Sequence, residues 1–121
     1  MSSNEWVGAV GYEQLTEILR AAHDHAALGK GKERHANNLP FEKQRMLSIS
    51  RAQGDDGGMA FQVQKKIQEG RQFDNMQQIE NELLGAINYT VGMIIYHRER
   101  FAESTKEKSH PNKNPNQALR T

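Results

Sequence analysis

Residues able to hold an anion gather in one short stretch of the chain. Residues 29–35, GKGKERH, place four cationic side chains among glycines, namely Lys30, Lys32, Arg34 and His35. Lysine and arginine side chains, together with accessible backbone amides, recognise phosphate, and a protonated imidazole adds charge. However, the stretch lacks GxxxxGK[ST] spacing and follows a predicted helix C-terminus, where the helix dipole disfavours anions. A phosphate-binding loop and a solvated connector both remain open interpretations.

A second unusual surface is predicted on the helix expected over residues 74–103. At about 100° per residue, one side of this helix carries a line of glycines and tyrosines, which we call the Gly–Tyr face: Gly85, Tyr89, Gly92 and Tyr96, flanked by Asn81 and Asn88. A mid-helix glycine costs about 1 kcal/mol relative to alanine, so two in line indicate a close approach. The face is either a packing surface, for a helix of this chain or of a second copy, or a ligand platform of rings, hydroxyls and amides.

Other reactive side chains lack the spacing that catalysis or metal binding requires. His23 and His25 are two residues apart on a predicted helix and therefore point about 200° from each other. The chain has no cysteine, and its serines lack a nucleophile motif. The sequence predicts no catalytic residue, no metal site and no cofactor.

A nucleotide pyrophosphohydrolase of the MazG kind is a further enzyme class that the last predicted helix brings into consideration. Its last helix changes from acidic to apolar, as Glu80, Glu82 and the following LLGAINY do here. Such enzymes hold magnesium with carboxylates one helical turn apart, in ExxE and ExxD. Neither motif occurs in the chain, so this class is only a distant alternative.

Hydrophobic periodicity predicts the helices that position these residues. Three shorter helices are expected, from Tyr12 to a stop at Gly29, from Pro40 to Gly54, and from Met59 to a stop at Gly70, the last two forming an αα-hairpin around residues 55–58. The long helix over 74–103 carries an apolar line that we call the outer stripe: Met76, Ile79, Leu83, Ile87, Val91, Ile94 and Phe101. Leu84 and Ile95 widen the apolar surface beside this line. We expect the outer stripe to close the core.

Composition and charge narrow the remaining possibilities. The 121 residues carry a net charge of +1. This overall charge is too small to attract nucleic acid, so we expect no nucleic-acid binding. No segment resembles a signal peptide or a membrane span, so we expect no membrane association and a cytoplasmic protein. We predict an all-α bundle of three to four helices with one domain over residues 1–103. A flexible, basic, polar tail is expected over residues 104–121.

One segment resembles a known family. The residues RMLSISRAQGDDGGMAF, from Arg45 to Phe61, and Gly11-Tyr12 before Leu15 are similar to the hairpin domain and opening segment of phage-encoded cyclic-oligonucleotide sponges that blunt CBASS and Thoeris defence. The resemblance covers about a fifth of the chain. It implies a small non-catalytic homo-oligomer in the host cytoplasm that sequesters a signalling nucleotide, with Tyr12 and basic residues near subunit boundaries.

We therefore predict a phage-type accessory protein that acts by binding a phosphate-bearing nucleotide. The expected ligand-binding residues are Tyr12, Lys30, Lys32, Arg34, His35, Asn88, Tyr89 and Tyr96. The alternatives are a module that inhibits or adapts a larger host protein and, further away, a divergent MazG-like pyrophosphohydrolase. We also expect a homo-oligomer, since burying the outer stripe in the core leaves the Gly–Tyr face for a neighbour.

Overall fold

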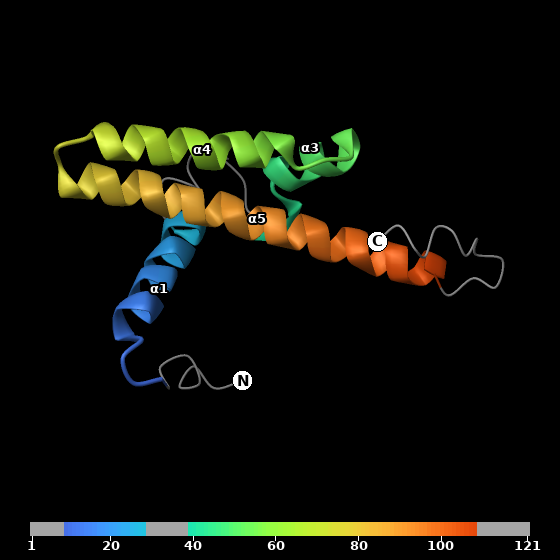
Figure 1. Cartoon of the computed structure of the whole chain (residues 1–121), viewed down its shortest axis with the longest axis horizontal. Coiled ribbons are helices and arrows are strands. Elements are labelled where there is room, and N and C mark those ends of the chain that lie inside the picture. The colour runs from blue at the N-terminus through green and yellow to red at the C-terminus, as the bar shows by residue number, and fades with distance from the viewer. Residues whose placement is uncertain (1–8, 29–38, 109–121) are drawn as a thin grey trace.

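The computed structural model describes residues 9–28 and 39–108, with side chains described through Thr105. Helices account for 84% of the described residues, which contain no strand. In chain order they are α1 (Glu13–Ala27), the short 3-10 helix η2 (Phe41–Lys43), α3 (Arg45–Gln53), α4 (Gly57–Gln72) and α5 (Met76–Lys108). The predicted all-α bundle is confirmed, and α5 is its longest element (Figure 1).

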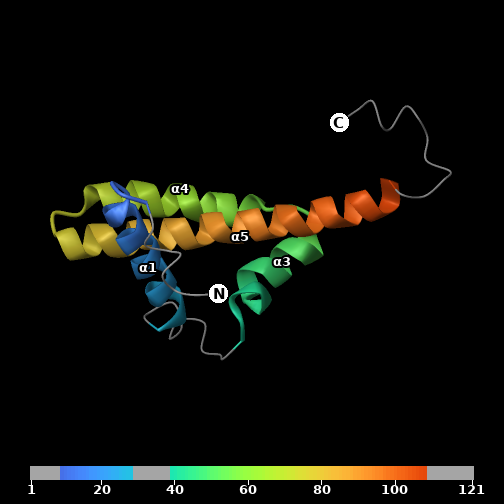
Figure 2. The ribbon, with the colours of Figure 1, turned by 90° about the horizontal axis from the view of Figure 1, so that it is seen from below.

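The pairing of α4 with α5 is the main helix contact of the fold. The two helices run side by side in opposite directions, as both views show (Figures 1 and 2). Glycines permit their close approach. A Cβ built on Gly70 of α4 would lie 3.2 Å from the Cβ of Glu82, and one built on Gly92 of α5 would lie 2.8 Å from the Sδ of Met59. Gly70 thus lies inside α4 as a contact point, and the prediction that it stops the helix is wrong.

The Gly–Tyr face of α5 packs against α4, so the first interpretation of that face is confirmed. Gly85 and Gly92 are buried, and Tyr96 is only 4% exposed. The small core consists of Leu47, Met59 and Tyr96, packed against partly buried Met46, Tyr89, Met93 and Ile95. The prediction that the outer stripe closes the core is wrong for most of that line, whereas Leu84 is 6% exposed and Ile95 packs against the core, as expected.

This reversal has a physical cause in side-chain volume. Two helices approach most closely where one of them presents glycine. The long side chains of α4, including Met59 and the Lys66 stem, fill the space above Gly92 and Gly85. The tyrosines beside these glycines supply the apolar area that a hydropathy pattern assigns to leucine and isoleucine. The Gly–Tyr face therefore forms a well-packed interface with α4 despite its polar composition.

Among the main helix contacts, α1 packs only against α5. Ala22 is 3% exposed, and the Asn88 side-chain amide donates a hydrogen bond of 3.0 Å to the Ala22 carbonyl. In Figure 1, α1 lies on the side of α5 away from α4, and its N-terminal end projects away from the other helices. Its apolar residues Leu15 and Ile18 are 51% and 46% exposed.

The helix boundaries follow local capping chemistry. Helix α3 ends at Gly54, in the left-handed conformation with φ of +81° and its amide bonded to the Ser50 carbonyl, as expected for a glycine stop. Before α5, the Asn75 side-chain oxygen accepts from the Gln78 amide at 3.1 Å. The helix is therefore capped at Asn75 and begins at Met76, two residues after the predicted start at residue 74. Helix α5 runs through Lys108, past the predicted domain limit at residue 103, and residues 109–121 of the predicted tail lie outside the described residues.

Candidate protein-binding surface

The outer stripe of α5 lies largely at the surface. Met76, Leu83, Val91, Ile94 and Phe101 are 66%, 37%, 38%, 50% and 70% exposed, and Ile79 and Ile87 are half-buried. By contrast, six apolar residues form the buried core of the described part of the chain. A soluble helix rarely presents a continuous apolar line to water unless another surface covers it. The stripe is therefore the leading candidate for a functional surface.

Three helices of the chain contact α5: α4 packs over Gly85 and Gly92, α1 meets α5 at Asn88, and α3 reaches Glu99. At about 100° per residue, most of the outer stripe lies on the side of α5 opposite Gly92, and this side is exposed. A shallow open hollow on this sector is lined by Thr90, Met93, Ile94, His97, Arg98 and Phe101. All six residues belong to α5, so the hollow is part of an exposed helix face.

The stripe also has the spacing of a helix-pairing seam. Counted in sevens, Glu80, Ile87, Ile94 and Phe101 repeat at one position, and Met76, Leu83, Thr90 and His97 repeat four residues before them. Alternating steps of three and four residues are typical of helices that pack along their length with a neighbouring helix. The seam extends from Met76 to Phe101, about 38 Å at 1.5 Å per residue.

Charges of opposite sign stand at the two ends of the seam. Glu80 and Arg98 are both exposed and are eighteen residues apart (98 − 80), which is five full turns at 3.6 residues per turn. They therefore project from the same side of α5. Among the described residues, neither has an ion-pair partner within 4.0 Å. The seam thus carries an acidic end and a basic end.

The residues predicted to bind a nucleotide do not gather at one place. Tyr12 precedes α1 and is 58% exposed, at the end of α1 that projects from the bundle (Figure 1). Asn88 is engaged with Ala22, whereas Tyr96 is buried in the core between α3, α4 and α5. Lys30, Lys32, Arg34 and His35 lie outside the described residues. A ligand-binding role for this set stays a prediction.

Tyr89 lies beside a lysine that the sequence did not single out for this role. The Lys66 side chain is only 12% exposed, and its stem covers Gly85. Its ammonium nitrogen lies 3.8 Å from a carboxylate oxygen of Glu82 and 6.0 Å from the centre of the Tyr89 ring. Burying the stem while pairing the charged head is favourable for a lysine. Lys66 therefore fills the gap that Gly85 leaves between α4 and α5.

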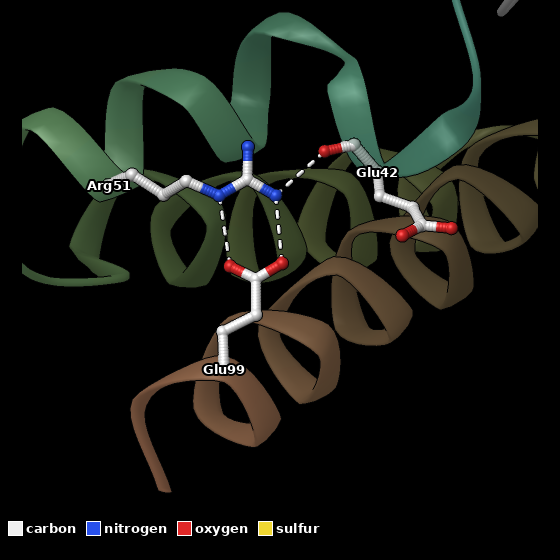
Figure 3. A network of polar contacts seen from close by, with 3 residues as sticks. All are labelled: Glu42, Arg51 and Glu99. Atoms are coloured by element: carbon white, nitrogen blue, oxygen red, sulfur yellow. Dashed lines mark hydrogen bonds and ion pairs between the residues drawn. The ribbon is translucent and has the colours of Figure 1, made fainter. Parts of the chain in front are cut away.

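Polar contacts hold the α3 end of the bundle against α5. The Arg51 guanidinium donates two hydrogen bonds of 2.9 Å to the Glu99 carboxylate and one of 2.8 Å to the Glu42 carbonyl oxygen (Figure 3). These bonds lower the pKa of the Glu99 carboxyl and raise the pKa of Arg51. Both side chains are more than a third exposed, so water screens the pair. The network fixes η2 and α3 to α5.

A histidine and an aspartate make a second link at the same end. His97 Nε2 lies 2.8 Å from Asp56 Oδ2, joining α5 to the residue before α4. The Asp56 contact gives His97 a structural role. Because His97 is also part of the seam, this link places one imidazole at the basic end of the outer stripe.

Neither a metal site nor a membrane-spanning helix is found in the described part of the chain. Within residues 9–28 and 39–108, no group of three histidine, aspartate or glutamate side chains is placed to hold a metal ion. Nor do the described helices include one with the length and apolar content needed to cross a membrane.

Sequence reasoning missed the outer stripe as a surface because hydropathy does not say which of two faces a neighbour covers. The signal that was available is the glycine line, since glycines in an α-helix mark the side that a second helix approaches. Glu80 and Arg98 were also missed, although their spacing of five turns is readable from the sequence. The Arg51–Glu99 pair joins residues that are distant in sequence, and no local pattern predicts it.

Comparisons with known proteins add no relative: no protein-family model matches the chain, and no curated protein and no solved structure shows significant similarity to it.

Proposed function

We propose that this protein is a helical interaction module that acts by binding another protein through the outer stripe of α5. The observation that carries this proposal is the exposure of five large apolar side chains along one line of a helix whose opposite face is already packed. Apolar lines of this kind receive a helix from a partner, with side chains anchored every three or four residues. This corresponds to the alternative in which the chain acts on a larger protein.

Charge and burial support protein binding over ligand capture at the same surface. The hollow on α5 is open and lined by apolar groups with His97 and Arg98 at its edge, whereas small-molecule sites enclose most of a ligand. Two of the three tyrosines expected to stack on a nucleotide are engaged in packing. Nucleotide sequestration and a phage accessory role remain predictions from the resemblance.

Site-directed photo-crosslinking tests the proposal. A photoreactive phenylalanine analogue is placed at position 94 in the outer stripe or, as a matched control, at position 61 on α4, where Phe61 is also exposed at 60%. In the cell that naturally makes the protein, we expect position 94 to give discrete protein adducts that Leu83→Glu suppresses, and position 61 to give none. No adduct at position 94, or equal labelling at both positions, would refute the proposal.

A ligand screen tests the competing prediction with the same purified chain. Cyclic dinucleotides, cyclic trinucleotides and nucleoside triphosphates are each added in a thermal-shift assay. A ligand at 100 times its Kd stabilises the folded state by about 2.7 kcal/mol, which is a readily measured shift. Selective stabilisation that Lys32→Ala with Arg34→Ala removes would favour sequestration, whereas no shift with any nucleotide would favour the interaction module.

A further inference from the structure

The seam on α5 carries Glu80 near one end and Arg98 near the other, so its charges are complementary to those of a second, reversed copy of the same helix. We infer that a second copy of this chain packs on the outer stripe in antiparallel orientation, so that two α5 helices form the centre of a symmetric dimer. The inference rests on the proposed function and names the partner. Its basis is the register of the seam together with Glu80 and Arg98, which have no ion-pair partner among the described residues.

The apolar register is self-complementary in the antiparallel sense. In two antiparallel helices, residue numbers increase along one helix while they decrease along the other. The numbers of any two contacting residues therefore add up to the same sum. With a sum of 177, Ile94 meets the partner's Leu83, Phe101 meets the partner's Met76, and Ile87 meets the partner's Thr90. These contacts pair one seam position with the other throughout, as in antiparallel helix packing. The two most exposed members, Phe101 and Met76, then cover each other.

The charges select this orientation over the parallel one. At the same register, Glu80 lies opposite the partner's His97 and beside the partner's Arg98, and the two-fold axis repeats the pairing at the other end. Glu80 and Arg98 project from the same side of α5, so both ion pairs form on one edge of the seam. In a parallel dimer aligned in register, the two Arg98 side chains would lie on opposite edges of the seam. Each Glu80, which shares the heptad position of Ile87 and Ile94, would face the partner's Glu80, which is repulsive.

The packing around α5 leaves room for this partner. α4 covers the Gly–Tyr face and α1 covers the side of Asn88. The outer stripe is the part of α5 that α4, α1 and α3 leave largely exposed, and a second α5 would cover it. The small core of a single copy also gains from the association, since apolar residues of both chains leave water together.

The oligomeric state is the first measurement. Light scattering after size exclusion should give a mass near 27.6 kDa, twice the 13.8 kDa of one chain. Ile94→Glu should raise the dimer Kd by about 100-fold or more, because two carboxylates become buried without partners. The matched control Phe61→Glu changes an exposed apolar residue on α4 and should leave the mass unchanged. Circular dichroism on each variant confirms that it is folded, since all of these residues lie at the surface.

Cysteine pairing then determines the orientation, and the natural chain offers a background free of cysteine. Leu83→Cys and Ile94→Cys are purified separately and oxidised with diamide, alone or mixed. The antiparallel register predicts a disulfide-linked dimer in the mixture and little in either sample alone. A parallel seam predicts the reverse. Glu80→Arg should raise the dimer Kd about tenfold, and adding Arg98→Glu to the same chain should restore it.

The outcomes separate the inference from the proposed function. A monomer of 13.8 kDa at 100 µM, a dimer unaffected by Ile94→Glu, or crosslinking of each cysteine variant only with itself would overturn the inference. If position 94 nevertheless photo-crosslinks to a different protein, the interaction module stands with another partner. If position 94 gives no adduct to any protein, including a second copy, the proposed function fails as well.

Discussion

The close approach of α4 and α5 makes an unequal prediction for two glycines that look alike in the sequence. Gly92→Ala adds a methyl group 2.8 Å from Met59 Sδ and 3.3 Å from Met46 Cε. Met59 is 2% exposed and packs with Leu47 and Tyr96, so it has little free space to enter. Gly85→Ala adds a methyl group 2.8 Å from Cδ of Lys66, and that flexible side chain can swing into water.

The magnitudes follow from opposing effects. Alanine stabilises a helix interior by about 1 kcal/mol relative to glycine. Overpacking a filled core costs about 1–3 kcal/mol, so Gly92→Ala should be destabilising by about 1 kcal/mol. At position 85 the loss is the Lys66 contact with Tyr89 and Glu82, worth about 0.5 kcal/mol at a partly exposed site. Gly85→Ala should therefore be neutral or stabilising by about 0.5 kcal/mol.

Thermal and urea denaturation at one fixed protein concentration measure the difference. A gap of about 1.5 kcal/mol corresponds to roughly 6–12 °C in Tm for a helical body of this size. A fixed concentration is needed because association shifts Tm. Met59→Ala combined with Gly92→Ala is the control, since space vacated by the methionine should remove the overpacking penalty. Equal effects of the two glycine substitutions, or a stabilising Gly92→Ala, would refute the packing of α4 on the Gly–Tyr face.

Three other predictions follow from single contacts. The Tyr96 hydroxyl is buried and has no hydrogen-bond partner among the described residues, so Tyr96→Phe should leave the free energy of unfolding within about 0.5 kcal/mol or raise it; a loss above 1 kcal/mol in urea denaturation would contradict that burial. The lowered pKa of Glu99 means that its contribution is present above the unfolded-state pKa and is lost as pH falls through the folded-state pKa. Glu99→Gln should therefore cost up to about 1 kcal/mol at pH 7 and progressively less in acid, and a penalty that stays constant down to pH 2 would count against the Arg51 ion pair. Asn88→Ala removes the bond to the Ala22 carbonyl, so hydrogen exchange should become faster in α1 and stay unchanged in α4; uniform acceleration in both helices would indicate global destabilisation instead.

The sequence by itself determined the helical class, the presence of a long helix over most of α5 and the end of α3, because these depend on local periodicity and on stop signals such as Gly54. It also showed that α5 has two distinct faces, since both the outer stripe and the Gly–Tyr face recur with the helical period. These properties need only the neighbours of each residue along one helix.

Only the tertiary structure decided which face of α5 is buried. Hydropathy assigns the core to Ile94 and Phe101, yet α4 packs over Gly85 and Gly92 because the glycines let its side chains come within contact distance. Close packing over a long helix–helix interface depends on the side chains of both helices, so the sequence of one helix alone does not determine it. The same holds for Arg51 and Glu99, which are 48 residues apart in the chain. Which surface remains for a partner therefore depends on how α4 and α5 meet.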